Sequence, residues 1–151
     1  MNKKEYVSKI LTPNKTKIIL VKLIQRLFEL FENEVINIQY GWACEIHNDL
    51  QYVNMRTGLS WVNKFIMNSI KQGIYQPGES DLILERKNKS LSILFCHEGD
   101  VHISGNENQI KLLLSKANLS NLFDIINKKP SKVTEKHLQK SSSTTERKTK
   151  G

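Results

Sequence analysis

Apolar residues recur at three- and four-residue intervals from residue 18 to residue 31, which is the spacing of one face of an α-helix. The opposite face is polar and is formed by Lys22, Gln25, Arg26, Glu29 and Glu32. Thr12 precedes Pro13, a pair typical of a helix start, because a threonine hydroxyl caps the first turn and proline fits its first position. We therefore predict an amphipathic helix from Thr12-Pro13 to about Asn33.

Alternating apolar and polar side chains follow this helix over residues 35–40. A period of two indicates a strand with one buried face. Trp42, Cys44 and Ile46 keep the same parity. We expect the strand either to run on past Gly41 or to bulge there, because glycine in a strand often marks such a site.

Residues 48–58 lack a clear period and are expected to form a loop that could hold a short strand at 50–54. A second amphipathic pattern begins at about Leu59. Gly73 fits the end of that helix, since glycine readily adopts the left-handed conformation found after a helix.

The next part of the chain is typical of an antiparallel meander. Pro77 and Gly78 stand where a type II turn requires proline and glycine. A strand is predicted at 81–85, a turn around Lys87-Asn88, and a β-hairpin over 90–105.

Two helices are expected after the hairpin. Asn106 with Gln109 three residues later resembles a capping box at the start of the first, and the second, shorter one covers 119–126. The chain is therefore predicted to be an α+β domain. Its small antiparallel sheet, made of the meander 81–104 and a strand near 35–46, would pack against the N-terminal amphipathic helix and two or three further helices.

The hairpin contains a cysteine and two of the four histidines. If Glu98-Gly99 is a two-residue turn, His97 faces Asp100 and Phe95 faces His102. Directly opposed residues share a face. In that register His97, Asp100 and His102 lie on one side, together with Leu91, Ile93 and Phe95. Cys96 points to the other side, with Leu94, Val101 and Ile103.

The formal net charge of +8 is concentrated at the two ends of the chain. Residues 18–127 carry ten basic and twelve acidic side chains, so the predicted globular part is mildly acidic. We divide the chain into a basic N-terminal segment (1–11), one α+β domain (12–127) and a basic tail (128–151), which we expect to be disordered because it is rich in lysine, serine and threonine. The charge therefore favours a nucleic-acid partner less than its total suggests.

No signal peptide and no membrane-spanning segment is evident in the pattern. Two cysteines are too few for a disulfide framework. We therefore expect a cytoplasmic protein whose two thiols, Cys44 and Cys96, are reduced and buried.

Cys96 beside His97 raises the question of a nucleophilic cysteine. Adjacent residues in a strand point to opposite faces, so neither His97 nor His102 is expected to reach the thiol. Cys96 is then a small core residue, and we predict no catalytic residue and no enzymatic activity.

His97, Asp100 and His102 would share a face in the predicted register. Two imidazoles and a carboxylate can hold zinc or non-haem iron. A metal-dependent enzyme using these three residues is the alternative interpretation. A hydrogen-bonded histidine–aspartate pair near a turn is the simpler one, so we expect no bound metal and no cofactor.

Acidic, imidazole and indole side chains recur at predicted strand ends and loops. Such a rim suits a basic protein partner, because complementary charge raises the association rate and selects the partner. The predicted partner-binding residues are Trp42, His47, Asp49, Glu79, Asp81, His97, Glu98, Asp100 and His102.

The segments GIYQPGESDLIL (Gly73–Leu84) and LFCHEGDVHISG (Leu94–Gly105) resemble those of small bacterial immunity proteins. Those proteins are the antidotes to polymorphic or contact-dependent toxins. The resemblance covers roughly residues 36–114 and includes the surroundings of Trp42 and Trp61. It implies a cytoplasmic α+β protein that binds one cognate toxin domain and blocks its active site without catalysis. It assigns no contact residues.

We therefore expect an immunity-type protein that inhibits a toxin by occlusion. Besides the metal-dependent enzyme, a second alternative is a nucleic-acid-associated protein that acts through its terminal lysines. The tail has no aromatic side chain to stack on bases, so we expect at most weak nucleic-acid contacts there.

Overall fold

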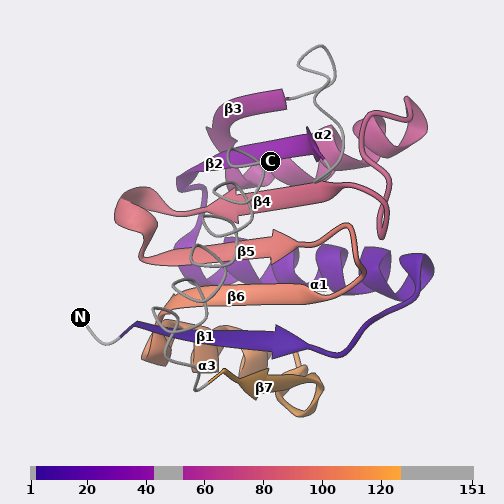
Figure 1. Ribbon diagram of the computed structural model, residues 1–151. Coiled ribbons are helices and arrows are strands. Elements are labelled where there is room, and N and C mark those ends of the chain that lie inside the picture. The colour runs from indigo at the N-terminus through magenta and orange to yellow at the C-terminus, as the bar shows by residue number, and fades with distance from the viewer. Residues whose placement is uncertain (1–2, 43–52, 127–151) are drawn as a thin grey trace, which may run out of the picture.

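The computed structural model describes residues 3–42 and 53–126, and its centre is one seven-stranded sheet (Figure 1). The strands are β1 (Lys3–Ser8), β2 (Val35–Trp42), β3 (Val53–Gly58), β4 (Asp81–Glu85), β5 (Leu91–Phe95), β6 (Val101–Asn106) and β7 (Phe123–Ile125). They lie in the order β3-β2-β4-β5-β6-β1-β7, and every neighbouring pair is antiparallel. The α+β class is confirmed, although the sheet is larger than predicted.

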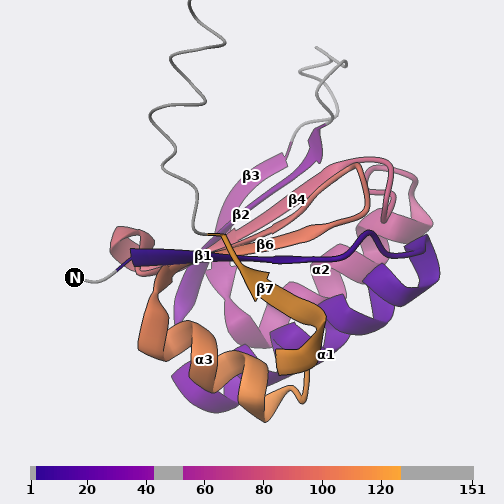
Figure 2. The same ribbon diagram turned by 60° about the horizontal axis from the view of Figure 1, so that its bottom comes forward.

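Three helices cover one face of this sheet, so the fold has two layers (Figure 2). They are α1 (Pro13–Phe31), α2 (Leu59–Lys71) and α3 (Glu107–Lys116). Two single-turn 3₁₀ helices, η2 (Lys87–Lys89) and η3 (Ser120–Leu122), lie in connections. Of the helices in the described ranges, none combines the length and apolar character needed to cross a bilayer.

The predicted starts of α1 and α3 are confirmed. The Thr12 hydroxyl accepts a hydrogen bond from the Lys15 amide at 3.2 Å. The Asn106 side chain accepts one from the Gln109 amide at 3.1 Å. Each cap satisfies an amide that has no partner inside its helix.

The start of α2 is capped from outside the helix. Asn33, in the turn after α1, accepts a hydrogen bond from the Ser60 amide at 2.9 Å. A Cβ at Gly58, the residue before α2, would lie 2.6 Å from that asparagine oxygen. Glycine is needed here because the capping side chain occupies the space of its missing Cβ.

The hydrophobic core fills the space between the sheet and the helices. Alternate residues of the central strands face it, and each of Leu82, Leu84, Ile93, Phe95 and Ile103 is 2% exposed or less. Burial of this kind, worth about 25 cal/mol per Å² of apolar surface, is the main stabilising contribution. The residues between them point to the open face of the sheet.

The predicted register of the β5–β6 hairpin is wrong by one residue. Phe95 pairs with Val101 and Leu94 with His102. Cys96 and Asp100 close a three-residue loop, in which the Gly99 amide donates to the Cys96 carbonyl at 3.0 Å and the Cys96 amide to the Asp100 carbonyl at 2.9 Å. Gly99 has a φ of +98°, which suits the last position of such a loop.

The observed register has a clear physical advantage. It places five large apolar side chains of the two strands on the buried face, namely Leu91, Ile93, Phe95, Val101 and Ile103, while Leu94 lies on the open face beside His102. The predicted register would have divided them between the two faces, with His102 on the same face as Leu91, Ile93 and Phe95. A one-residue slip moves a whole strand's side chains to the other face, so burial selects the three-residue loop.

The predicted boundary at residue 12 is also wrong, because residues 3–8 form β1. This strand lies between β6 and β7, and it buries Tyr6 and Ser8. The segment was predicted to be a basic extension because of its lysines, although more and less buried residues alternate near its end. No local signal shows that the partners of β1 lie about a hundred residues away in the sequence.

Two other boundaries differ from the prediction. The strand expected at 50–54 is described at 53–58, as β3. Instead of a helix, 119–126 contains the turn η3 and the short edge strand β7. The turn before β4 and the irregularity after Tyr40 are confirmed.

Candidate functional site

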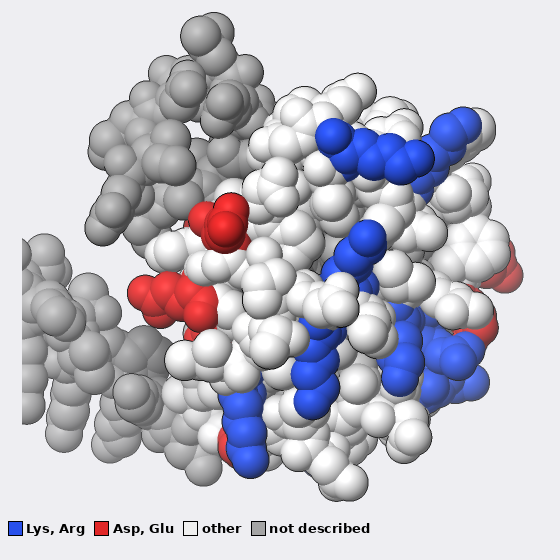
Figure 3. All heavy atoms as spheres, turned by 90° about the vertical axis from the view of Figure 1, so that its right-hand side faces the viewer, with Lys and Arg blue, Asp and Glu red and all other residues white. Residues whose placement is uncertain are grey.

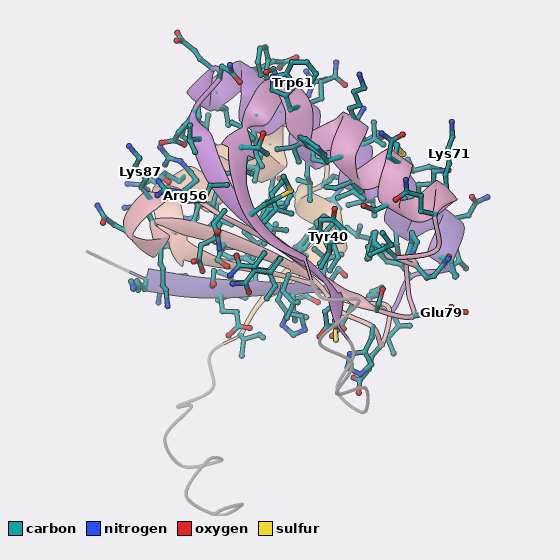
Figure 4. The ribbon with its side chains drawn as sticks, turned by 90° about the horizontal axis from the view of Figure 1, so that it is seen from above. Tyr40, Arg56, Trp61, Lys71, Glu79 and Lys87 are labelled. Atoms are coloured by element: carbon teal, nitrogen blue, oxygen red, sulfur yellow. The ribbon has the colours of Figure 1, made fainter. Side chains whose placement is uncertain are left out.

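The described members of the predicted partner-binding set gather at one end of the sheet. Glu79 precedes β4 and Asp81 begins it, while His97, Glu98 and Asp100 occupy the β5–β6 loop, and His102 lies in β6. His47, Asp49 and the side chain of Trp42 lie outside the described residues. Figure 4 shows Glu79 and Lys71 at this end, and Arg56 and Lys87 at the opposite end.

Asp81 holds His97 in place. One oxygen of its carboxylate, Oδ1, accepts a hydrogen bond from the His97 backbone amide at 2.7 Å and lies 2.9 Å from the ring nitrogen Nδ1. Both side chains are about one-fifth exposed. The ring therefore has a defined orientation, set by a residue sixteen positions earlier in the chain.

The Cys96 sulfur lies 3.7 Å from His97 Nδ1. The prediction that the thiol and this ring point to opposite faces is therefore wrong. Its reasoning assumed a regular strand, in which neighbours alternate. His97 is already the first residue of the loop, where that alternation no longer holds. Cys96 is half-buried rather than fully buried.

This contact does not lower the pKa of the thiol. Burial, together with the charges of Asp100 and Asp81, raises the pKa of Cys96 to about 11, so the thiol is protonated at neutral pH. In addition, Cys96 and Asp81 approach the same ring nitrogen. A nucleophile–histidine–aspartate triad uses the two different nitrogens of the ring.

A second cluster joins β1 to β6. His102 Nε2 lies 2.8 Å from Asp100 Oδ2, and its Nδ1 lies 3.1 Å from Glu5 Oε1. The other oxygen of Asp100, Oδ1, is buried and has no hydrogen-bond partner among the described residues. Glu5 was not among the predicted site residues, because residues 1–11 were predicted to lie outside the domain. The alternation of residues in β1 is the signal that indicates a strand there.

The structure does not assemble the metal site considered from the sequence. Among the described residues, two groups have metal-binding atoms that all lie within 4.8 Å of one another: Asp81, Cys96 and His97, and Cys96, Glu98 and Asp100. The combination of His97, Asp100 and His102 is not such a group. Cys96 belongs to both groups, although the sequence analysis treated it as a core residue.

The opposite end of the sheet is basic. A hollow of about 430 Å³ is lined by Val35, Asn37, Arg56, Glu85, Arg86, Lys87, Asn88 and Lys89. Arg86 is committed to the fold: it makes two hydrogen bonds to Glu34, at 2.7 and 3.0 Å, and one to Gln109 at 2.8 Å. Its guanidinium also lies 3.6 Å from the centre of the Phe31 ring.

The helical layer exposes aromatic residues that the predicted set did not include. Trp61 is 53% exposed on the outside of α2 (Figure 4), with the Lys64 ammonium 5.5 Å from its ring. Phe28 and Phe65 are also exposed. Sequence periodicity alone does not separate such residues from core ones, because apolar residues at the margin of a helix stripe fit both roles.

No family model, no curated protein and no solved structure matches the chain. Its function is therefore argued from the chemistry of its own residues.

Proposed function

We propose that this chain is a cytoplasmic binding protein of the immunity type, which neutralises a cognate bacterial toxin domain by covering its active site. The observation that carries the proposal is the gathering of carboxylates at one end of the sheet. Asp81, Glu98 and Asp100 come from two separate segments and meet beside the two imidazoles. A cluster of this kind complements a basic surface on a partner.

Two exposed glutamates at this end of the sheet support a role in recognition, while Asp81 and Asp100 are about one-fifth exposed. The Glu98 side chain is 72% exposed at the tip of the hairpin, and Glu79 is exposed as well. Figure 3 looks onto this end of the molecule. Two groups of acidic side chains lie toward the open face of the sheet, while lysine and arginine side chains spread over the rest. This distribution would orient a partner, since like charges juxtaposed in a wrong pose are costly.

The chemistry of the cluster also favours binding over catalysis. Its one thiol is protonated at neutral pH, and the nearby ring shares a single nitrogen between that thiol and Asp81. A histidine that acts as general base for a nucleophile would contact the nucleophile through one ring nitrogen and the carboxylate through the other.

The test uses a toxin domain encoded beside this chain, expressed with and without it. Co-expression is expected to restore growth, and the purified pair is expected to bind. Glu79→Lys and Glu98→Lys, singly and together, should slow association at low salt, by about tenfold or more for the pair. Glu29→Lys is the matched control: it reverses an exposed carboxylate on α1 that pairs with Arg26.

Two results would contradict the proposal. One is growth inhibition that persists despite co-expression. The other is binding that is insensitive to both glutamates and is lost in Trp61→Ala, which would place the interface on the helical layer.

A further inference from the structure

Three different ligand types meet at the start of the β5–β6 loop. Asp81 brings a carboxylate from the first residue of β4, and Cys96 and His97 bring a thiol and an imidazole from the end of β5. We propose that Asp81, Cys96 and His97 form a binding site for a divalent transition metal, with zinc as the best fit. The proposal does not depend on the toxin-binding function, because metal binding is a property of the isolated chain.

The spacing of the three groups suits such an ion. Zinc binds sulfur at about 2.3 Å and nitrogen or oxygen at about 2.0–2.2 Å, so two ligands of a tetrahedral site lie roughly 3.3–3.6 Å apart. Cys96 Sγ lies 3.7 Å from His97 Nδ1, which in turn lies 2.9 Å from Asp81 Oδ1. Changes of a few tenths of an ångström would bring both pairs to coordination distances.

The ligand types select among metals. A thiolate and an imidazole suit zinc and other late transition metals, whereas magnesium and calcium prefer oxygen ligands alone. The carboxylates of Asp81 and Asp100 make the surroundings of the sulfur negative. That field opposes a free thiolate and favours a cation beside it.

The surroundings of the three ligands also resemble the outer contacts of known metal sites. The His97 amide fixes Asp81 Oδ1 at 2.7 Å. Glu98 Oε1 lies 3.9 Å from the outer ring nitrogen of His97, and metal-binding histidines commonly turn their second nitrogen to a carboxylate. The hydrogen bond between the His97 amide and Asp81 would hold both residues in position before an ion arrives, whereas the Glu98 carboxylate is too far from the ring for a hydrogen bond.

Asp100 lies beside the cysteine but does not belong to the group formed by Asp81, Cys96 and His97. A carboxylate oxygen of Asp100 lies within 4.8 Å of the Cys96 sulfur. Its Oδ1 is buried without a hydrogen-bond partner among the described residues, while its Oδ2 is held by His102. An oxygen of this kind is costly to bury unless something pairs with it, and its negative charge beside the sulfur favours a cation at the neighbouring site.

The first experiment titrates cobalt(II), a spectroscopic substitute for zinc, into the reduced full-length protein. We expect one ion per chain and the charge-transfer absorption of a cobalt–thiolate bond. Cys96→Ser should abolish that absorption, and His97→Ala and Asp81→Asn should weaken binding by at least about tenfold. Cys44→Ser and Glu79→Gln are the matched controls and should bind as the wild type does.

The second experiment needs no variant, so a folding defect cannot obscure it. Zinc is added to the wild-type chain, and alkylation of each cysteine is followed by mass spectrometry. Zinc should protect Cys96 and raise the thermal midpoint, because a ligand that binds only the folded state stabilises it. The proposal is overturned if stoichiometric zinc neither protects Cys96 nor shifts the midpoint, or if the cobalt–thiolate absorption depends on Cys44.

Discussion

At the residue scale, two buried tyrosines show how the same side chain can be favourable or costly. Tyr40 and Tyr75 pack edge to face, with ring centres 6.5 Å apart. The Tyr40 hydroxyl accepts a hydrogen bond from Ser69 at 2.7 Å. The Tyr75 hydroxyl is fully buried and has no partner among the described residues. An unpaired buried hydroxyl opposes folding, whereas a paired one does not.

Replacing each tyrosine by phenylalanine is therefore expected to have opposite effects. Tyr40→Phe leaves the Ser69 hydroxyl without its acceptor and should lower the free energy of unfolding by about 1–2 kcal/mol. Tyr75→Phe removes an unpaired polar atom and should leave stability unchanged or raise it by up to about 1 kcal/mol. Urea unfolding of both variants beside the wild type measures the difference. A loss of stability in Tyr75→Phe would mean that its hydroxyl is paired.

The Tyr75 phenol should also leave a signature in alkaline solution. Burial, and then the charge of Asp81, raises its pKa above the usual range. As pH rises above about 10, the unfolded chain therefore releases this proton before the folded one does, and the stability of the wild type falls. Tyr75→Phe should lose stability less steeply between pH 9 and about pH 11. Equal slopes in the two proteins would contradict this.

At the scale of elements, Arg86 joins parts of the fold that are distant in the sequence. It follows β4, it contacts Glu34 at the start of β2 and Gln109 in α3, and it stacks on Phe31 of α1. Its side chain is 17% exposed and that of Glu34 is 22% exposed. Because both side chains are largely buried, we expect this pair to contribute more to stability than an exposed surface ion pair does.

Replacing one partner of this pair should lower the stability of the fold more than replacing both partners. Arg86→Met leaves Glu34 without its partner and should destabilise the fold by roughly 2–3 kcal/mol, somewhat less than for a fully buried pair. The double variant Arg86→Met/Glu34→Leu should recover part of that loss, because no charge is then left unpaired. Chemical denaturation of the two single variants and the double variant measures the coupling. Additive losses would show that the two side chains act independently.

At the scale of the whole molecule, the position of β1 decides what a minimal folded chain contains. β1 is an internal strand, since β6 pairs with one of its edges and β7 with the other. Without it, β7 would lose its neighbour among the described strands, and β6 would be exposed at the edge of the described sheet. The described fold ends with β7 and residue 126.

The two ends of the chain should therefore respond differently to truncation. Removing residues 1–11 should abolish cooperative thermal unfolding, because the sheet loses an internal strand. Removing residues 128–151 should leave the melting midpoint and partner binding unchanged. Circular dichroism and the binding assay described above compare both truncations with the full chain. A stable protein that begins at residue 12 would contradict the role of β1.

Much of the fold could be predicted because its signals are local. The caps at Thr12 and Asn106, the helical periodicity of α1 and α2, and the alternation in the 81–104 meander all involve neighbours in the sequence. Interactions over three or four residues depend less on tertiary context than strand pairing does, so the sequence by itself determined these elements and the α+β class, although the local pattern at 119–126 was overridden.

The geometry of the candidate site depended on strand register and on where strands end, which local sequence patterns do not specify. The register of the β5–β6 hairpin was decided by burial of five apolar side chains and by the loop that Gly99 permits, and it placed His102 on the open face. The approach of Cys96 to His97, the reach of Asp81 across from β4 and the pairing of Glu5 with His102 follow from that arrangement. Only the tertiary structure decided them, because the contacts of Asp81 and Glu5 join strands whose relative positions are set by packing of the whole sheet, and the Cys96–His97 contact depends on where β5 ends and the loop begins.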